Sequence, residues 1–156
     1  MKKLITSLTT FLVVVFLNAS IFAQQTSRIA QFNIDKGVAL QGYDPVAYFT
    51  QNKAVKGKKE LAVAAEGITY YFATADDKEL FKKDFKKYEP QYGGWCAYAM
   101  GASSEKVEID PETFKIIGGK LYLFYHTWTN NTLNKWNKDE TNLKSKADFS
   151  WAKFFK

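Results

Sequence analysis

The side chain best suited to chemistry is Cys96, because it is the only cysteine in the sequence. A lone cysteine cannot form a disulfide within its own chain, so it stays a free thiol, bridges to another molecule or binds a metal. The preceding pair, Gly93 and Gly94, leaves the backbone open and would let a partner approach the sulfur. The alternative is a buried, inert thiol that packs as a small apolar side chain.

Two further residues could help Cys96 to hold a soft metal. Met100 follows four residues later, so a helix through both would place the two sulfurs on one face. Thiolate and thioether ligands suit copper(I), and His126, the only histidine, could be a third ligand or a base. The structural alternatives stay open, since methionine often fills gaps in a core and a lone histidine is often a satisfied structural residue.

Other residues could line a ligand pocket around the sulfur. We predict this lining to comprise Tyr43, Asp44, Tyr92, Gly93, Gly94 and Tyr98. Asp44 could instead fix the turn before Pro45, and the tyrosines could be half-buried core residues. A hydrolase could be assembled from Cys96, His126 and Asp110, but no catalytic signature surrounds them. The sequence therefore favours a binding protein over an enzyme.

The strands that must position these residues form two predicted hairpins. Each hairpin has a two-residue turn of the type that joins antiparallel strands, Glu66-Gly67 and Gly118-Gly119. The predicted strands are 61–65 with 68–73, and 115–117 with 120–125.

Helical patterns occupy much of the remaining chain. Thr74 is the predicted cap of a helix whose apolar stripe contains Phe81, Phe85 and Tyr88. This helix ends before Pro90. With the hairpins, it predicts an α+β fold in which a small antiparallel sheet packs with several short helices.

Two more helical regions are predicted toward the C-terminus. A short helix over 95–100 would place Cys96 near its N-terminus, where the helix dipole stabilises a thiolate. The tail is predicted to be helical after 129 and again over 146–154. Its inward-facing side chains are then Trp136, Trp151 and Phe155.

The first 23 residues have the pattern of a secretory signal peptide. Lys2 and Lys3 precede an apolar core at 11–17, and Ala23 is a suitable cleavage position. We therefore expect a periplasmic or secreted protein with no membrane segment after cleavage. Residues 24–34 are expected to be flexible, and 35–156 to form one domain.

The charge of the chain argues against nucleic-acid binding. The net charge of +6 falls to +4 when Lys2 and Lys3 leave with the signal peptide. Nearly all of this charge is lysine, whereas nucleic-acid readers rely on arginine forks and a clustered basic stripe.

The chain resembles the YHS domain family, specifically its exported branch of YHS domain-containing (seleno)proteins. The resemblance rests on residues 42–49 (GYDPVAYF), 67–72 (GITYYF) and 92–99 (YGGWCAYA), with the helix between them. Metal-binding members place cysteines where this chain has Ala47 and Ala73, and near Asp76 and Asp77. The Tyr-His-Ser tripeptide is also missing, so the resemblance implies that the family's usual metal site is absent.

The exported branch instead keeps the position of Cys96, where some relatives carry selenocysteine. The resemblance therefore implies soft-metal or redox chemistry at that position. Three hypotheses follow. The first is an exported YHS-like module that binds a soft metal, with copper favoured, or a small ligand at Cys96. The second is a thiol-redox protein in which an exported thiol partner resolves Cys96. The third is a structural or partner-binding domain with an inert Cys96.

Overall fold

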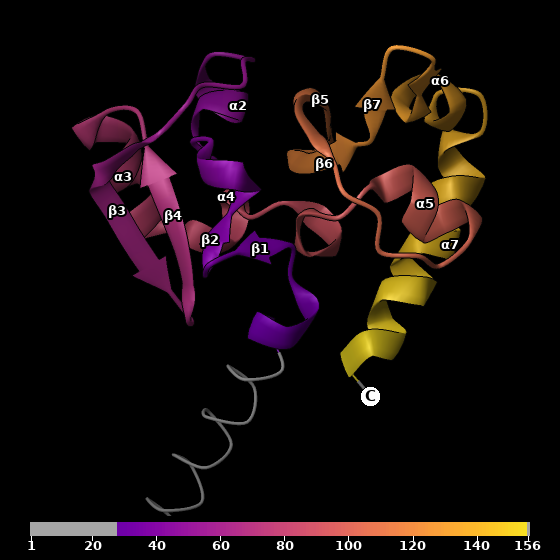
Figure 1. Cartoon of the computed structure of the whole chain (residues 1–156), viewed down its shortest axis with the longest axis horizontal. Coiled ribbons are helices and arrows are strands. Elements are labelled where there is room, and N and C mark those ends of the chain that lie inside the picture. The colour runs from indigo at the N-terminus through magenta and orange to yellow at the C-terminus, as the bar shows by residue number, and fades with distance from the viewer. Residues whose placement is uncertain (1–27, 156) are drawn as a thin grey trace, which may run out of the picture.

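The computed structural model describes residues 28–155, so the predicted signal peptide and residues 24–27 lie outside the described part. Figure 1 shows β1–β4 with α2–α4 on one side of the molecule and β5–β7 with α5–α7 on the other. The elements follow in the order β1 Ile34–Asp35, β2 Val38–Ala39, η1 Leu40–Gly42, α2 Ala47–Thr50, β3 Lys58–Ala65, β4 Ile68–Phe72, α3 Ala75–Lys83, α4 Phe85–Tyr88, η2 Gln91–Gly94, α5 Ala97–Ala102, β5 Asp110–Ile117, β6 Lys120–Phe124, β7 His126–Thr127, β8 Asn130–Asn131, α6 Thr132–Trp136, α7 Glu140–Ala152 and η3 Lys153–Phe155. This mixture of small sheets and short helices confirms the predicted α+β class.

The larger sheet has the strand order β1-β2-β4-β3. Its β3–β4 hairpin turns at Glu66 and Gly67, whose φ values of 46° and 84° are those of the expected two-residue turn. The strand β3 begins at Lys58, earlier than predicted, and its pairing with β4 shifts register between Lys58 and Val63. The sheet is not purely antiparallel, since Val38 of β2 pairs in parallel with Thr69 of β4.

The predicted helix after β4 begins as expected but breaks in the middle. The hydroxyl of the N-cap Thr74 accepts a hydrogen bond from the Asp77 backbone N–H. Asp84 leaves the helical conformation, with φ −156° and ψ 73°, and divides the segment into α3 and α4. Aspartate is a weak helix former, so packing of Phe81 and Tyr88 into the core prevails over continuity of the helix.

The second hairpin, β5–β6, lies between two hydrophobic clusters. Its turn at Gly118 and Gly119 has φ values of 56° and 73°, which confirms the predicted turn. Side chains of β6 alternate between the clusters, with Leu121 and Leu123 in one and Tyr122 and Phe124 in the other. The strand is therefore buried on both faces, and it joins the two sides of the molecule.

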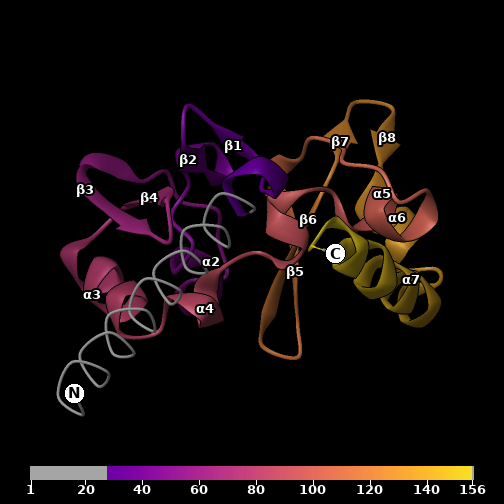
Figure 2. The same cartoon turned by 90° about the horizontal axis from the view of Figure 1, so that it is seen from below.

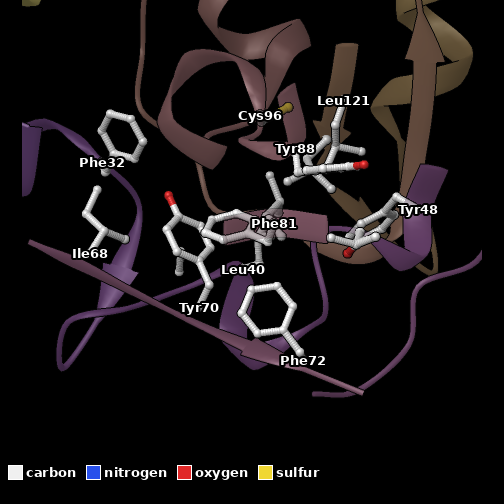
Figure 3. Packing of buried hydrophobic residues seen from close by; sticks show 14 of the residues in the cluster. Phe32, Leu40, Tyr48, Ile68, Tyr70, Phe72, Phe81, Tyr88, Cys96 and Leu121 are labelled. Atoms are coloured by element: carbon white, nitrogen blue, oxygen red, sulfur yellow. The ribbon is translucent and has the colours of Figure 1, made fainter. Parts of the chain in front are cut away.

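The first cluster gathers around Phe81, with Tyr70, Phe72 and Tyr88 nearby (Figure 3). The second cluster centres on the predicted core residue Trp136, which is fully buried. Trp151 is half-buried and packs against both clusters. The prediction for Phe155 is wrong, because this side chain is 44% exposed in the final turn of the chain.

Residues 28–34, which we expected to be flexible, make specific contacts in the structure. The guanidinium of Arg28 donates to the buried carboxylate of Glu89, which also accepts a hydrogen bond of 2.8 Å from the Tyr70 hydroxyl. Phe32 packs edge-on against Trp151. These side chains attach the start of the described chain to the core. No helix within residues 28–155 is long and apolar enough to cross a membrane.

Candidate functional site

Cys96 follows the turn η2, whose last residues have left-handed backbone conformations. The φ values are 54° at Tyr92, 60° at Gly93 and 86° at Gly94. A Cβ added to Gly93 would lie 2.8 Å from the Trp151 ring, so this position needs glycine for close packing as well as for its φ. Gly93 therefore opens no route to the sulfur for an outside partner, because Trp151 fills the space beside it.

The Cys96 sulfur is completely buried and has two polar neighbours. It accepts a hydrogen bond of 3.3 Å from the Tyr125 backbone N–H. It also lies 3.4 Å from the hydroxyl oxygen of Thr132. The Thr132 hydroxyl donates its only proton to the Tyr125 carbonyl oxygen at 2.7 Å, so the thiol S–H must be the donor to Thr132. The neutral thiol thus has a partner for both its donor and its acceptor role.

Cys96 is the N-cap residue of α5, close to the predicted position. Its side chain makes no capping hydrogen bond to α5, and α5 has only six residues. The side chain belongs instead to the first cluster (Figure 3). The expected stabilisation of a thiolate by the helix N-terminus therefore has no supporting contact.

Met100 and Cys96 belong to different hydrophobic clusters. Cys96 packs in the first, whereas Met100 packs in the second with Tyr122 and Trp136. The spacing of four residues predicts a shared face only if both residues are helical. Cys96 has ψ 116°, which is not helical, and so its side chain leaves in another direction.

His126 is half-exposed and is held by neighbours other than Cys96. Its Nδ1 lies 3.0 Å from the Thr113 hydroxyl and 3.3 Å from Asp110 Oδ2. The Thr113 hydroxyl donates to Asp110, so Nδ1 carries the proton that it shares with these two oxygens. Asp110 and His126, two members of the hypothetical hydrolase triad, therefore lie together. The third member, Cys96, has different hydrogen-bond partners, Tyr125 and Thr132.

The described residues offer no cluster of histidine, cysteine and carboxylate side chains that could hold a metal ion. Among residues 28–155, no three such side chains come together in this way. A copper site at Cys96 would need Met100 and His126 to leave the contacts described above.

Asp44 is fully buried and has a structural role. Its carboxylate accepts hydrogen bonds from the backbone N–H groups of Val46 at 2.8 Å, Ala47 at 3.4 Å and Ala73 at 2.7 Å. Burial raises the pKa of Asp44 to about 6, and the charge of Asp77 adds to this rise while the backbone bonds oppose it. The backbone N–H groups of Ala47 and Ala73 thus meet at one carboxylate.

The predicted tyrosine lining is divided among separate parts of the molecule. Tyr43 lies beneath the Lys56 ammonium, 4.2 Å from its ring centre. Tyr92 donates a hydrogen bond of 2.9 Å to Asp148 on α7. Tyr98 is half-buried and lies between the two clusters. Together with the packed Gly93, these positions do not form one pocket with the sulfur.

A cleft of about 990 Å³ lies elsewhere, over the outer face of the larger sheet. The residues Ile68, Tyr70 and Phe72 of β4 point into the core, so Thr69 and Tyr71 face the other way and line this cleft. Figure 2 shows α3 and α4 on one side of β3 and β4. The remaining lining residues are Asn33, Ile34, Asp35, Lys36, Val38, Gln41, Gly42, Lys59 and Glu108.

This cleft is not predicted from the sequence, although one signal for it is present there. The alternation of β4 predicts which side chains leave the core, but not which distant segments stand beside them.

In comparisons with known proteins, no family model, curated protein or solved structure matches this chain.

Proposed function

We propose that this protein is an exported YHS-like binding module that recognises its ligand at the surface, with Cys96 as a structural thiol. The burial and the two hydrogen bonds of the Cys96 sulfur carry this proposal. The proposal of export rests on the signal-peptide pattern of the first 23 residues. The proposed family rests on the motifs at residues 42–49, 67–72 and 92–99. The proposal keeps the ligand-binding module of the first sequence hypothesis and takes the inert Cys96 from the third, so the ligand site lies away from the sulfur.

The contacts of the thiol favour this role over copper binding. Copper(I) prefers several soft ligands, and Cys96 shares its immediate surroundings with a backbone N–H and a hydroxyl. Metal binding also requires the thiolate, which would remove the proton that the thiol gives to Thr132. Both changes would disturb a packed core.

The same contacts disfavour redox chemistry at Cys96. A redox thiol reacts as an accessible thiolate, and oxidation follows exposure. An outside oxidant or thiol would have to reach a sulfur with no exposed surface. Cys96 is more readily explained as a small polarisable side chain that links α5 to the segment around Tyr125.

Native mass spectrometry tests the proposal. The purified protein and its Cys96→Ser variant are incubated with copper(I) or with dilute hydrogen peroxide under native conditions. We expect neither a copper adduct that depends on Cys96 nor a sulfenic acid at Cys96. A stoichiometric copper adduct that is lost in the variant would support the metal hypothesis instead, and oxidation of Cys96 would support the redox hypothesis.

A further inference from the structure

The cleft over the larger sheet has a rigid aromatic floor at Tyr71. A Cβ added to Gly42 would lie 3.2 Å from the Tyr71 ring, so one side of the ring rests on glycine backbone. A Cβ added to Gly57 would lie 2.5 Å from the Tyr71 main chain. Gly57 also donates a backbone hydrogen bond of 2.9 Å to Gly42. These contacts fix the ring before any ligand arrives, which lowers the entropy cost of binding.

Some polar side chains in the walls of the cleft already have hydrogen-bond partners, whereas others, called uncommitted below, have none. Asn33 donates to Glu108 at 3.2 Å, and Gln41 donates to the Ile109 carbonyl at 3.0 Å. Within residues 28–155, five other polar lining residues make no side-chain hydrogen bond or ion pair. They are Asp35, Lys36, Lys59, Thr69 and Tyr71.

These uncommitted groups restrict the chemistry of a ligand. Two ammonium groups, on Lys36 and Lys59, suit an anionic group such as a carboxylate. Asp35 and Thr69 can accept hydrogen bonds from hydroxyl groups. Most of the lining is polar, unlike the largely apolar pockets that hold drug-like ligands and cofactors. The flat ring of Tyr71 offers an apolar surface for the C–H face of a sugar.

We propose that this cleft binds an acidic oligosaccharide, with a sugar ring on Tyr71 and a carboxylate near Lys36 and Lys59. This inference rests on the proposed surface-binding function. The volume of about 990 Å³ is at the upper end of the range for small-molecule sites and leaves room for more than one sugar unit. Asp35 and Thr69 then accept hydrogen bonds from hydroxyl groups. The ammonium groups of Lys36 and Lys59 attract the acid, and the carboxylates of Asp35 and Glu108 in the same lining reduce this preference to a modest one.

Titration of the ¹⁵N-labelled protein with trigalacturonate tests this proposal. We expect saturable shifts of the Thr69 and Tyr71 amide signals, with a dissociation constant below about 1 mM. The neutral trisaccharide maltotriose should bind about tenfold more weakly. Absence of saturable shifts, shifts confined to other regions, or equal binding of maltotriose would overturn the proposal.

Matched variants separate the ring from the charge. Tyr71→Ala should weaken trigalacturonate binding about tenfold, whereas Tyr71→Phe keeps the ring and should change it little. Lys59→Gln should weaken binding about threefold. The controls are Trp128→Ala, at a fully exposed position on the β7–β8 turn, and Lys120→Gln, at the β5–β6 turn. Unchanged affinity in both Tyr71→Ala and Lys59→Gln contradicts the proposal.

The result of the saccharide titration can be distinguished from the result of the copper and peroxide experiment on Cys96. If trigalacturonate does not bind while the thiol stays protected, the ligand assignment fails and the structural role of Cys96 stands. If Cys96 binds copper or is oxidised under native conditions, the proposed function fails whether or not the saccharide binds.

Discussion

Among single residues, Cys96 has two polar partners that bear directly on the reactivity of its thiol. A lone free thiol suggests reactivity when only the sequence is known. In the structure, the same thiol donates a hydrogen bond to the Thr132 hydroxyl and accepts a hydrogen bond from the Tyr125 N–H. The thiol therefore stabilises the junction between α5 and the segment that leads into β7.

This role predicts a measurable loss of stability in Cys96→Ala. The substitution leaves the partly buried Tyr125 N–H without its acceptor and removes the sulfur from the core. We expect the free energy of unfolding to fall by about 1–3 kcal/mol in urea titrations. Thr132→Ser keeps the hydroxyl and serves as the control, with a smaller loss. A Cys96→Ala variant as stable as the parent protein would show that the contacts of the sulfur contribute nothing.

The raised pKa of Asp44 predicts that the free energy of unfolding depends on pH. Its pKa of about 6 in the folded protein lies above the ordinary value of 3.8 because the carboxyl group is buried. The folded state therefore holds this proton more tightly than the unfolded state. The contribution of Asp44 to stability is complete below about pH 4 and is lost as the pH rises through 6. A ¹³C NMR titration of the Asp44 carboxyl carbon measures this pKa, and a midpoint at or below 4 would refute it.

Among the elements, the turn η2 connects the helix α4 to the cysteine and packs against both Phe32 and Trp151. Gly93 combines a φ of 60° with a position directly against Trp151 and Phe32. A two-residue hairpin turn needs only the positive φ. Gly119, with φ 73° and open space around its Cα, is an example of that simpler requirement.

These two glycines allow a matched comparison. Gly119→Ala should lower the free energy of unfolding by about 1 kcal/mol, from left-handed strain alone. Gly93→Ala should cost more than about 2 kcal/mol, because its new methyl group also meets the Trp151 ring. Thermal or urea unfolding measures both. Equal losses for the two variants would mean that packing around η2 is loose.

At the scale of the whole molecule, the N-terminal residues of the described chain are bound to the core through Arg28. Removal of its guanidinium in Arg28→Met leaves the Glu89 carboxylate buried, with Tyr70 as its main donor. We expect a loss of about 3 kcal/mol in the free energy of unfolding. Lys82→Met removes an exposed ion pair with Glu79 and should change stability by less than about 1 kcal/mol. Similar small losses in both would refute the anchoring role.

The local parts of this fold could be predicted from the sequence, because their causes lie within a few residues. The Thr74 cap and the turns at Glu66-Gly67 and Gly118-Gly119 are of this kind. The break at Asp84 was missed because tertiary packing decides it. Cys96 and Thr132 lie 36 positions apart, so no local pattern indicates their contact. The cleft was missed for the same reason, since its lining extends from Asn33 to Glu108.

Cys96 is closed off within the folded core, and the kinetics of thiol labelling provide a direct measurement of this burial. The rate of reaction with an aromatic disulfide reagent is measured in increasing, sub-denaturing urea. A structural thiol reacts only through opening of the core, so the labelling rate should rise with urea as steeply as global unfolding predicts. Rapid labelling without urea, at a rate independent of urea concentration, would show that the sulfur is open to partners and is not closed off in the core.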